Sequence, residues 1–348
     1  MLTNVAAWIT APHARLSIGP TPYPTPAPGE VIIRTSFVAI NPLEYKIQDH
    51  DPPIAGKPIV YPNILGADVS GTIVELGADV TIRQIGDRVI ANADGVSTSS
   101  ARSAFQHYVQ LRATDTTFLP AHVPLEAGVV LPLACDTTAA GLFVPDQLGL
   151  STFNLSASGP PISTTTTPIA NATLLIWGGS SSVACCAIQM ARAAGYSVFT
   201  TSSARNHALC ETMGAVRVFD YSDPGVEDAI VLACRDRRVV GALDCIGDCE
   251  GSLLPCARIL ARVLKLEQEE GQERDEKEEE RGRECGGGSG SVGRISTVLA
   301  PPPDVVLPRG VTATRRKCRL FCVLPGFCFR LIALTSSLSC SAHSRSTS

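Results

Sequence analysis

The sequence predicts a two-domain α/β protein in which a small β barrel precedes a doubly wound parallel sheet. The chain has 348 residues, which is more than one domain of ordinary size requires. Residues 1–122 contain short strand-like segments separated by turn residues at intervals of about 8–12, as in a partly closed barrel. From residue 173 onwards, short apolar runs alternate with segments of helical periodicity, which is typical of a parallel sheet.

The composition excludes several classes of protein. Hydrophobic residues make up 45% of the chain and its net charge is −4, so a sizeable core is expected and nucleic-acid binding is not. Residues 1–18 lack the pattern of a signal peptide, and no uncharged apolar run reaches about 18 residues. We therefore expect a cytoplasmic protein without a membrane span. The 13 cysteines include no C-x-x-C pair, which argues against a zinc ribbon and a disulfide framework.

In the N-terminal region, turn residues separate short strands in the way expected of a β barrel. Residues 30–40 alternate as a strand until Asn41-Pro42 ends it. Gly66, Gly71 and Gly77 then mark places where a barrel strand can bend. Further strands are expected at residues 89–92 and 105–111, and two bridging helices within 124–143.

The most informative stretch is a βαβ unit over residues 173–221. An apolar strand at 174–177 is followed by Gly178 and Gly179, then by a helical pattern that Gly195 ends. Such a glycine-rich turn lets the backbone approach a pyrophosphate at the helix N-terminus. The fingerprint positions for three glycines hold Gly179, Ser181 and Ala184, so the signal is imperfect. The alternative is an ordinary strand-to-helix turn that binds no ligand.

The remainder of the chain first continues this alternation and then departs from it. Helices are expected at residues 206–213 and 226–234, and strands at 197–201, 216–219, 241–246 and 295–299. Residues 150–171 read as a surface loop. Residues 267–284 hold ten acids and four bases, which indicates a solvated helix or a disordered insert. We expect a charged, glycine-rich disordered insert at 264–292 and an aberrant, disordered tail at 317–348.

Several segments carry a family resemblance, in order, over residues 1–260. They read VAINPLEYK at 38–46, LGADVSGTIVELG at 65–77, GDRV at 86–89, AFQHYV at 104–109, TAAGLF at 138–143, WGGSSSV at 177–183, FDY at 219–221 and ALDCI at 242–246. The chain thus resembles the medium-chain dehydrogenase/reductases, in the zinc-free branch that holds quinone-oxidoreductase-like proteins and fungal trans-acting enoyl reductases of polyketide synthesis. The resemblance implies a GroES-like catalytic domain at 1–130 and a Rossmann nucleotide-binding domain at 131–316, C-terminally incomplete.

No zinc is predicted. A catalytic zinc needs three ligands of Cys, His or carboxylate type. Zinc members of the family carry a Cys after the first barrel strand and a Gly-His-Glu in the glycine corner, where this chain has Asn41-Pro42-Leu43-Glu44 and Gly66-Ala67-Asp68. His50, His107 and His122 are interpreted as ordinary surface or hydrogen-bonded residues.

The cofactor is predicted to be NADPH. NAD sites commonly place an acid at the end of the second Rossmann strand, and this chain has Thr201-Ser202-Ser203-Ala204-Arg205-Asn206 there instead. A guanidinium beside small hydroxyl groups suits a 2′-phosphate. The alternative for Arg205 is a solvated residue at a helix start.

The resemblance implies the remaining site residues. For the cofactor these are Gly178, Gly179, Ser180, Ser181, Ser182 and Val183 at the pyrophosphate, Ser203, Ala204, Arg205 and Asn206 at the 2′-phosphate, Tyr221 at the adenine, Val298 and Leu299 at the nicotinamide, and Leu43, Glu44 and Lys46 from the barrel. For the acyl substrate they are Thr138, Ala139, Gly141 and Leu142. The catalytic candidates are Lys46, Thr138 and Tyr45, the last as a proton donor or as a packed barrel-wall residue.

The implied reaction is hydride transfer to the β-carbon of an enoyl thioester, an enone or a quinone, with the cofactor supplying the reactivity. The substrate is then a small molecule or a carrier-bound acyl group, with a polyketide synthase as partner and a monomer or homodimer as the assembly. The family continues with further helix–strand units after residue 299, and the sequence shows no such pattern there. We therefore expect a sheet without its last edge, and keep as the alternative a catalytically impaired relic that still binds nucleotide.

Overall fold

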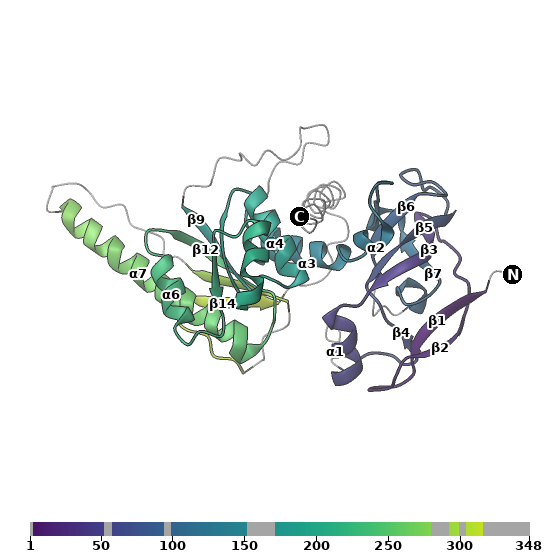
Figure 1. Ribbon diagram of the computed structural model, residues 1–348, viewed down its shortest axis with the longest axis horizontal. Helices are drawn as coiled ribbons and strands as arrows, with labels where there is room; N and C mark the ends of the chain where they lie inside the picture. Colours follow the sequence, from purple (N-terminus) through teal and green to yellow (C-terminus); the bar gives the residue numbers. More distant parts are fainter. Residues whose placement is uncertain are drawn as a thin grey trace, which may run out of the picture. The chain divides into compact units, whose positions relative to one another are not determined.

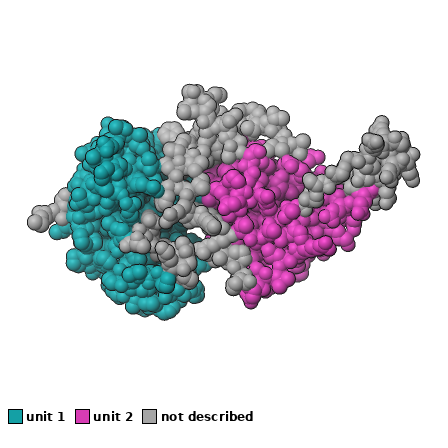
Figure 2. All heavy atoms as spheres, turned by 180° about the vertical axis from the view of Figure 1, so that it is seen from behind, with its two compact units in different colours: residues 1–136, 319–348 teal, residues 137–318 magenta. Residues whose placement is uncertain are grey.

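The computed structural model describes residues 3–51, 58–93, 99–151, 171–279, 292–298 and 304–315. The described residues divide into two compact units, one running up to Asp136 and the other starting at Thr137 (Figure 2). The boundary falls inside helix α3, Pro132–Phe143, a few residues after the boundary expected from the sequence.

The first unit is built from two antiparallel sheets. One has three strands in the order β2-β1-β4, and the other has five in the order β7-β3-β5-β6-β8. The strands are β1 Asn4–Ile9, β2 Ser17–Thr21, β3 Glu30–Ala39, β4 Asn63–Ile64, β5 Asp68–Leu76, β6 Arg88–Asn92, β7 Tyr108–Arg112 and β8 Thr116–Phe118. The helices are α1 Pro42–His50 and α2 Leu125–Gly128, with single 3₁₀ turns at η1 Ser100–Arg102 and η2 Ala113–Asp115.

Alternating side chains of the five-stranded sheet form the first unit's core. Val69 and Ile73 on β5 pack with Val31, Ile33 and Val89, all fully buried. Burial of each such side chain contributes about 1.5–3 kcal/mol. Gly71 lies between them because a Cβ there would come within 2.1 Å of the Arg34 carbonyl oxygen. The glycine expected at a strand bend is therefore required by the close approach of β3.

The second unit contains one six-stranded sheet, and all its strand pairs are parallel. Its order is β11-β10-β9-β12-β13-β14, the 3-2-1-4-5-6 order of dinucleotide-binding folds. The strands are β9 Ala172–Trp177, β10 Ser197–Ser202, β11 Arg217–Asp220, β12 Arg238–Asp244, β13 Gly293–Thr297 and β14 Val311–Arg315. Every residue of β9 is buried, which explains its unbroken apolar run.

Helices cover both faces of this sheet (Figure 1). They are α4 Ser182–Ala193, α5 His207–Met213, α6 Val226–Ala233 and α7 Leu254–Glu279, with a 3₁₀ turn at η3 Ala204–Asn206 and a π-helical turn at η4 Cys249–Leu253. One core cluster lies under α6 and α7, where Ile230, Ile259 and Leu260 meet Leu175 and Phe199 of the sheet. The predicted fold class, a barrel followed by a Rossmann-type sheet, is confirmed.

The expected disordered insert at 264–292 is wrong for its first part, because α7 continues to Glu279. Leu264 and Leu266 still pack against the core under α7, so the helix remains anchored beyond residue 264. Beyond them the Glu, Gln and Lys residues are strong helix formers, and Lys265 pairs with Glu269 one turn on at 3.6 Å. Residues 280–291 lie outside the described residues.

The sequence also gave no sign of β14, so the expectation of a sheet without its last edge is wrong. Residues Val311–Arg315 pair in parallel with β13 over five positions and complete the sheet order. Val311, Thr312 and Thr314 are β-branched and suit a strand, but five residues after a proline-rich stretch form too short a pattern to recognise. The described part of the connection before it, residues 304–310, contains no helix. The tail at 317–348 and most of the 150–171 loop lie outside the described residues.

One helical stretch in the described ranges, Leu125–Phe143, is long and apolar enough to cross a membrane by length and composition alone. Of its most apolar window, 61% is buried inside the protein. Gly141 in this stretch lies against the sheet, where an added Cβ would meet Leu243 at 2.8 Å. The stretch therefore has the environment of a core helix.

Candidate cofactor-binding site

The turn after β9 lies close to neighbouring segments because it contains two glycines. Gly178 has φ +84°, and a Cβ on Gly179 would lie 2.3 Å from the Thr200 hydroxyl oxygen. The N–H of Gly178 donates to Oγ1 of Thr201 at 3.1 Å, and the N–H of Gly179 to the Thr201 carbonyl at 2.7 Å. Glycine is required at both positions, because Gly178 has a positive φ and a side chain on Gly179 would force the turn away from β10.

Helix α4 begins immediately after this turn. Ser181 is its N-cap, and the Ser181 side chain accepts from the Ala184 N–H at 3.3 Å. The first N–H groups of a helix have no intrahelical acceptor, and the helix dipole makes this end positive. Ser182 and Val183 occupy the first turn of this 12-residue helix. Their N–H groups therefore point toward the helix N-terminus, where anions bind.

The end of β10 provides a second group of polar side chains beside the first. Nδ2 of Asn206 donates to Oγ of Ser180 at 3.0 Å and to Oγ of Ser203 at 3.2 Å. The ring of His207 lies 3.3 Å from the Ser202 carbonyl and helps to hold the same turn. Arg205 is exposed and makes no hydrogen bond or ion pair within the part of the chain that the structure describes. A cation, two hydroxyls and an amide therefore surround one turn.

The ends of β11 and β12 complete this edge of the sheet. Asp220 pairs in register with Ser202, and hydrogen bonds from the hydroxyl and N–H of Ser222 hold the pKa of the Asp220 carboxyl below its usual range. The next residue, Tyr221, is 52% exposed. We call this edge, where the parallel strands end, the carboxyl edge.

Asp244 organises the turn after β12. It is fully buried and accepts from the N–H groups of Ile246 and Gly247, both at 3.0 Å. The Val298 N–H donates to the Asp244 carbonyl at 3.1 Å, which brings the end of β13 to the same place. The Ile246 side chain covers Gly178, where an added Cβ would meet it at 2.5 Å. Leu299 lies outside the described residues.

The donor set fits a phosphorylated dinucleotide. Ligands of open parallel sheets bind at the carboxyl ends of the strands, and the glycine turn lies on the central strand β9. The residues offer helix N-terminal N–H groups for one phosphate and hydroxyl, amide and guanidinium donors for another.

The thiols close to the glycine turn are buried or partly buried, and their pKa values are raised. Sγ of Cys185 donates to the Gly179 carbonyl at 3.7 Å, and burial raises the pKa of Cys185 to about 11. Burial also raises the pKa of Cys210 and Cys245. These three side chains therefore act as packing groups, because the thiolate is the nucleophilic form.

The first unit contains a cluster of buried polar side chains, which we call the Asp68 cluster: Asn41, Glu44 and Asp68. Nδ2 of Asn41 donates to Oδ2 of Asp68 at 2.8 Å, and the Leu133 N–H at the start of α3 donates to Oδ1 at 2.7 Å. The two oxygens of Glu44 accept from the N–H groups of Asn41 at 2.7 Å and Ala67 at 2.9 Å.

Burial raises the pKa values of both carboxyls in the Asp68 cluster. For Asp68 the value reaches about 7, because burial and the carboxyls of Glu44 and Asp136 outweigh the hydrogen bonds from Asn41 and Leu133. For Glu44, burial outweighs the hydrogen bonds from backbone N–H groups. Within the described ranges, no three His, Cys, Asp or Glu side chains are placed to hold a metal ion.

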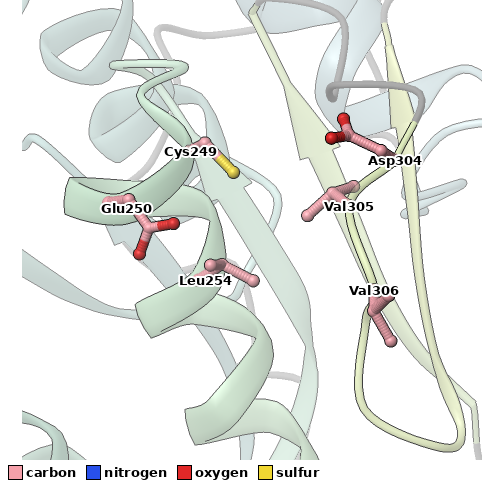
Figure 3. Close-up of a pocket in the computed structure, with 6 residues that line it drawn as sticks. All are labelled: Cys249, Glu250, Leu254, Asp304, Val305 and Val306. Carbon is pink, nitrogen blue, oxygen red and sulfur yellow. The ribbon is translucent and has the colours of Figure 1, made fainter.

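A separate hollow of about 300 Å³ lies beside the first turns of η4 and α7 (Figure 3). Its walls are formed on one side by Cys249, Glu250 and Leu254, and on the other by residues 304–306. Burial raises the pKa of Cys249, with help from neighbouring carboxylates. None of the described residues in its wall is basic, and two of them, Glu250 and Asp304, are acidic, so these residues do not suit a phosphate.

Comparisons with known proteins identify the family. The alcohol dehydrogenase GroES-like domain matches residues 27–121. Dehydrogenase pigH of Monascus ruber is 40% identical over 267 residues, covering 76% of this chain and 69% of the relative. Trans-enoyl reductase himH of Aspergillus japonicus is 38% identical over 264 residues, covering 75% and 72%. An alcohol dehydrogenase superfamily structure from Novosphingobium aromaticivorans aligns with TM-score 0.67 at 21% identity, covering 96% and 87%.

The chain belongs to the medium-chain dehydrogenase/reductase superfamily. It is an oxidoreductase of that superfamily related to fungal trans-enoyl reductases, and the family uses a nicotinamide cofactor. The resemblance inferred from the sequence is confirmed. In the second unit of this oxidoreductase, the glycine turn and the β10 turn lie side by side and are joined by the hydrogen bond from Asn206 to Ser180.

The residues predicted for the substrate are buried in this reductase. Thr138 is fully buried and its hydroxyl donates to the Val183 carbonyl at 2.9 Å. Ala139 and Leu142 are also buried, and Gly141 is packed against Leu243 and Ser296. In each case the reductase's own atoms cover the residue, so the role in substrate binding stays a prediction.

Helix α1 carries four of the predicted site residues, of which two are engaged within the protein and two are not. Glu44 is buried, and its two carboxylate oxygens are occupied by backbone donors, while Leu43 packs against the small core of Ile9, Ile47 and Leu65. Tyr45 is 49% exposed, and Lys46 is half-buried with no hydrogen bond or ion pair among the described residues. Only Tyr45 and Lys46 therefore have functional groups free for a ligand.

Three residues of the carboxyl edge were not predicted as site residues from the sequence. Asp220, Asp244 and Ile246 shape the turns around the glycine pair. Asp220 and Asp244 each stand at the last position of a strand, and that position was the available signal.

Proposed function

We propose that the protein is an NADPH-dependent oxidoreductase that reduces an activated C=C bond in an enoyl thioester, an enone or a quinone. The observation that supports it is the turn after β10, where an exposed Arg205 stands with Ser203 and Asn206 and none of the residues of the turn itself is acidic. A guanidinium with hydroxyl donors recognises a 2′-phosphate, whereas a carboxylate there recognises the 2′-hydroxyl of NAD.

We assign a different part of the cofactor to each group of residues. Ser180 to Val183 would hold the pyrophosphate, Ser203 to Asn206 the 2′-phosphate, and Tyr221 the adenine. Val298 with Leu299 would line the nicotinamide, and Lys46 with its neighbours on α1 would approach from the barrel. When bound, the cofactor supplies hydride for the β-carbon of the substrate. Tyr45, which is exposed, is the candidate proton donor for the α-carbon.

The donor chemistry of the first unit supports a reaction without zinc. At the two places where zinc members carry ligands, the oxygens of Glu44 and Asp68 accept hydrogen bonds from Asn41, Ala67 and Leu133. Neither place offers a Cys or a His, and a catalytic zinc needs three ligands of Cys, His or carboxylate type.

The substrate and partner are proposed by analogy with the relatives named as trans-enoyl reductases. We infer a carrier-bound acyl substrate, a polyketide synthase as partner and a cytoplasmic location. A small-molecule enone or quinone is the other substrate class that this chemistry allows.

The alternative is an impaired relic that binds nucleotide without turnover. The connection between β13 and β14 favours it, because the described residues 304–310 contain no helix where parallel strands usually have one. Such a change lies next to the strand that would line the nicotinamide.

The test is a titration of the full chain with adenosine 2′,5′-bisphosphate and with 5′-AMP, in the wild type and in Arg205→Ala. We expect the variant to bind the bisphosphate about 10–100-fold more weakly, since a charged hydrogen bond is lost, and to bind 5′-AMP within about twofold of wild type. Arg192→Ala, at the opposite end of α4, is the control.

Activity is then measured as NADPH oxidation with a crotonyl thioester and with a quinone. Absence of any nucleotide binding would sink the proposal. Nucleotide binding without hydride transfer to either acceptor would favour the relic.

A further inference from the structure

We propose that Asn206 is a positioning residue that joins the two anion-binding turns into one unit and thereby sets the preference for a 2′-phosphorylated nucleotide. This inference rests on the proposed function, and it adds a second role for Asn206 to its place in the 2′-phosphate turn. Asn206 acts through Ser180 and Ser203.

The geometry places one side-chain amide across two turns. Asn206 is the last residue of η3, and its Nδ2 lies 3.0 Å from Oγ of Ser180 and 3.2 Å from Oγ of Ser203. Ser180 follows the glycine pair and Ser203 follows β10, so these two bonds link segments 26 residues apart in sequence. The three side chains are half-buried, which leaves part of each accessible to a ligand.

The direction of these bonds matters for anion binding. An amide NH₂ is only a donor, so both serine oxygens are acceptors in this network. Each serine O–H hydrogen is then free to donate elsewhere. An anion needs donors, and the amide therefore leaves Ser180 and Ser203 in the state that suits phosphates on both sides of it.

The backbone around Asn206 is held independently of its side chain. The Asn206 N–H donates to the Ser203 carbonyl at 2.8 Å, and the neighbouring His207 ring contacts the Ser202 carbonyl. Removing the amide should therefore change how the two serines are presented while the turn itself remains in place. The two turns would then respond to a nucleotide separately.

Replacing Asn206 with aspartate distinguishes a residue that positions the serines from one that only fills space. Asn206→Asp keeps the shape of the side chain, but its carboxylate accepts hydrogen bonds, so it would draw the two serine hydrogens toward itself. A residue that only filled space would tolerate this change better than Asn206→Ala. A residue that presents serine donors would tolerate it worse.

The experiment measures the ratio of the dissociation constants for 5′-AMP and adenosine 2′,5′-bisphosphate on the full chain by calorimetry. We expect this ratio to fall about fivefold in Asn206→Ala and about tenfold or more in Asn206→Asp. Ser180→Ala is expected to lower the ratio about threefold in the wild-type background and to have no further effect in the Asn206→Ala background. That dependence follows because Ser180 influences the 2′-phosphate turn only through Asn206.

Gln189→Ala is the matched control, since it removes an amide on α4 that donates to the Cys185 carbonyl at 2.9 Å, away from both turns. An unchanged ratio in Asn206→Asp would overturn the proposal, and so would an equal effect of Ser180→Ala in both backgrounds. If the wild type binds neither probe, the proposed function fails. If the wild type prefers the bisphosphate and the Asn206 variants keep that preference, only the role of Asn206 fails.

Discussion

The carboxyl edge of the second unit and the Asp68 cluster of the first both gather polar side chains, but different atoms satisfy them. In the Asp68 cluster the carboxylate oxygens of Glu44 and Asp68 meet donors from the protein itself, at 2.7–2.9 Å. At the carboxyl edge, Arg205 has no partner among the described residues and two serines accept without an assigned acceptor for their own hydrogens.

The difference separates structural polar groups from ligand-binding ones. A buried group that lacks a partner is destabilising, so a cluster completed by the protein itself is part of the fold. Donors left at the surface beside a helix N-terminus are available to an anion. The residue types alone do not distinguish the two cases, since both contain small polar and charged side chains.

The largest expected effect is on the stability of the first unit. Asp68→Ala leaves the Asn41 amide and the Leu133 N–H without their acceptor in a fully buried place. We expect a loss of about 2–4 kcal/mol, since each unpaired buried donor costs about 1–3 kcal/mol. The measurement is urea unfolding of the full chain followed by tryptophan fluorescence. The exposed Asp49→Ala is the control, and equal midpoints for the two variants would contradict the structural assignment of the cluster.

A smaller effect is expected in the pH dependence of stability. The pKa of folded Asp68 is about 7, above its ordinary value of 3.8. The folded chain therefore keeps a proton that the unfolded chain releases between about pH 4 and 7, so stability falls as the pH rises through this window. Asp68→Asn has no proton to lose at this position. Between pH 5 and 7.5 the wild type should lose about 2 kcal/mol more than this variant, measured by unfolding at both pH values.

Parallel slopes for the wild type and Asp68→Asn would show that Asp68 keeps an ordinary pKa. The comparison of slopes also removes the contribution of titrating groups that do not interact with Asp68, because both proteins carry the same ones. Glu44 and Asp136 are the carboxyls that face Asp68, and both are unchanged in the variant.

Much of the second unit was predictable because its signals are local. The apolar run of β9, the glycine pair after it and Gly214 after α5 each act within a few residues, and the structure places strand, turn and helix end accordingly. The charged part of α7 was ambiguous, since the composition of a solvated helix resembles that of a disordered segment. Strand β14 was missed because its partner β13 lies beyond a proline-rich connection.

The site was predictable only where its parts are neighbours in sequence. The turn after β10 holds Ser203, Arg205 and Asn206 within four residues, so their shared location could be inferred. The role of Asp68 depends on Leu133, 65 residues away, and sequence spacing gives no information about such a bond. The same holds for Thr138, whose acceptor is the carbonyl of Val183, 45 residues further on.

The smallest expected effect concerns Thr138, which was predicted to contact substrate and is fully buried in the structure. Thr138→Val keeps the shape and removes the 2.9 Å hydrogen bond to Val183, so stability should fall by about 1 kcal/mol. If Thr138 only packs, the KM for a crotonyl thioester stays within about twofold. Thr212→Val is the matched control, because it removes a 2.8 Å hydroxyl–carbonyl bond on an exposed helix face. A raised KM with an unchanged unfolding midpoint would instead place Thr138 with the ligand-binding residues and weaken the rule that groups satisfied within the protein serve the fold.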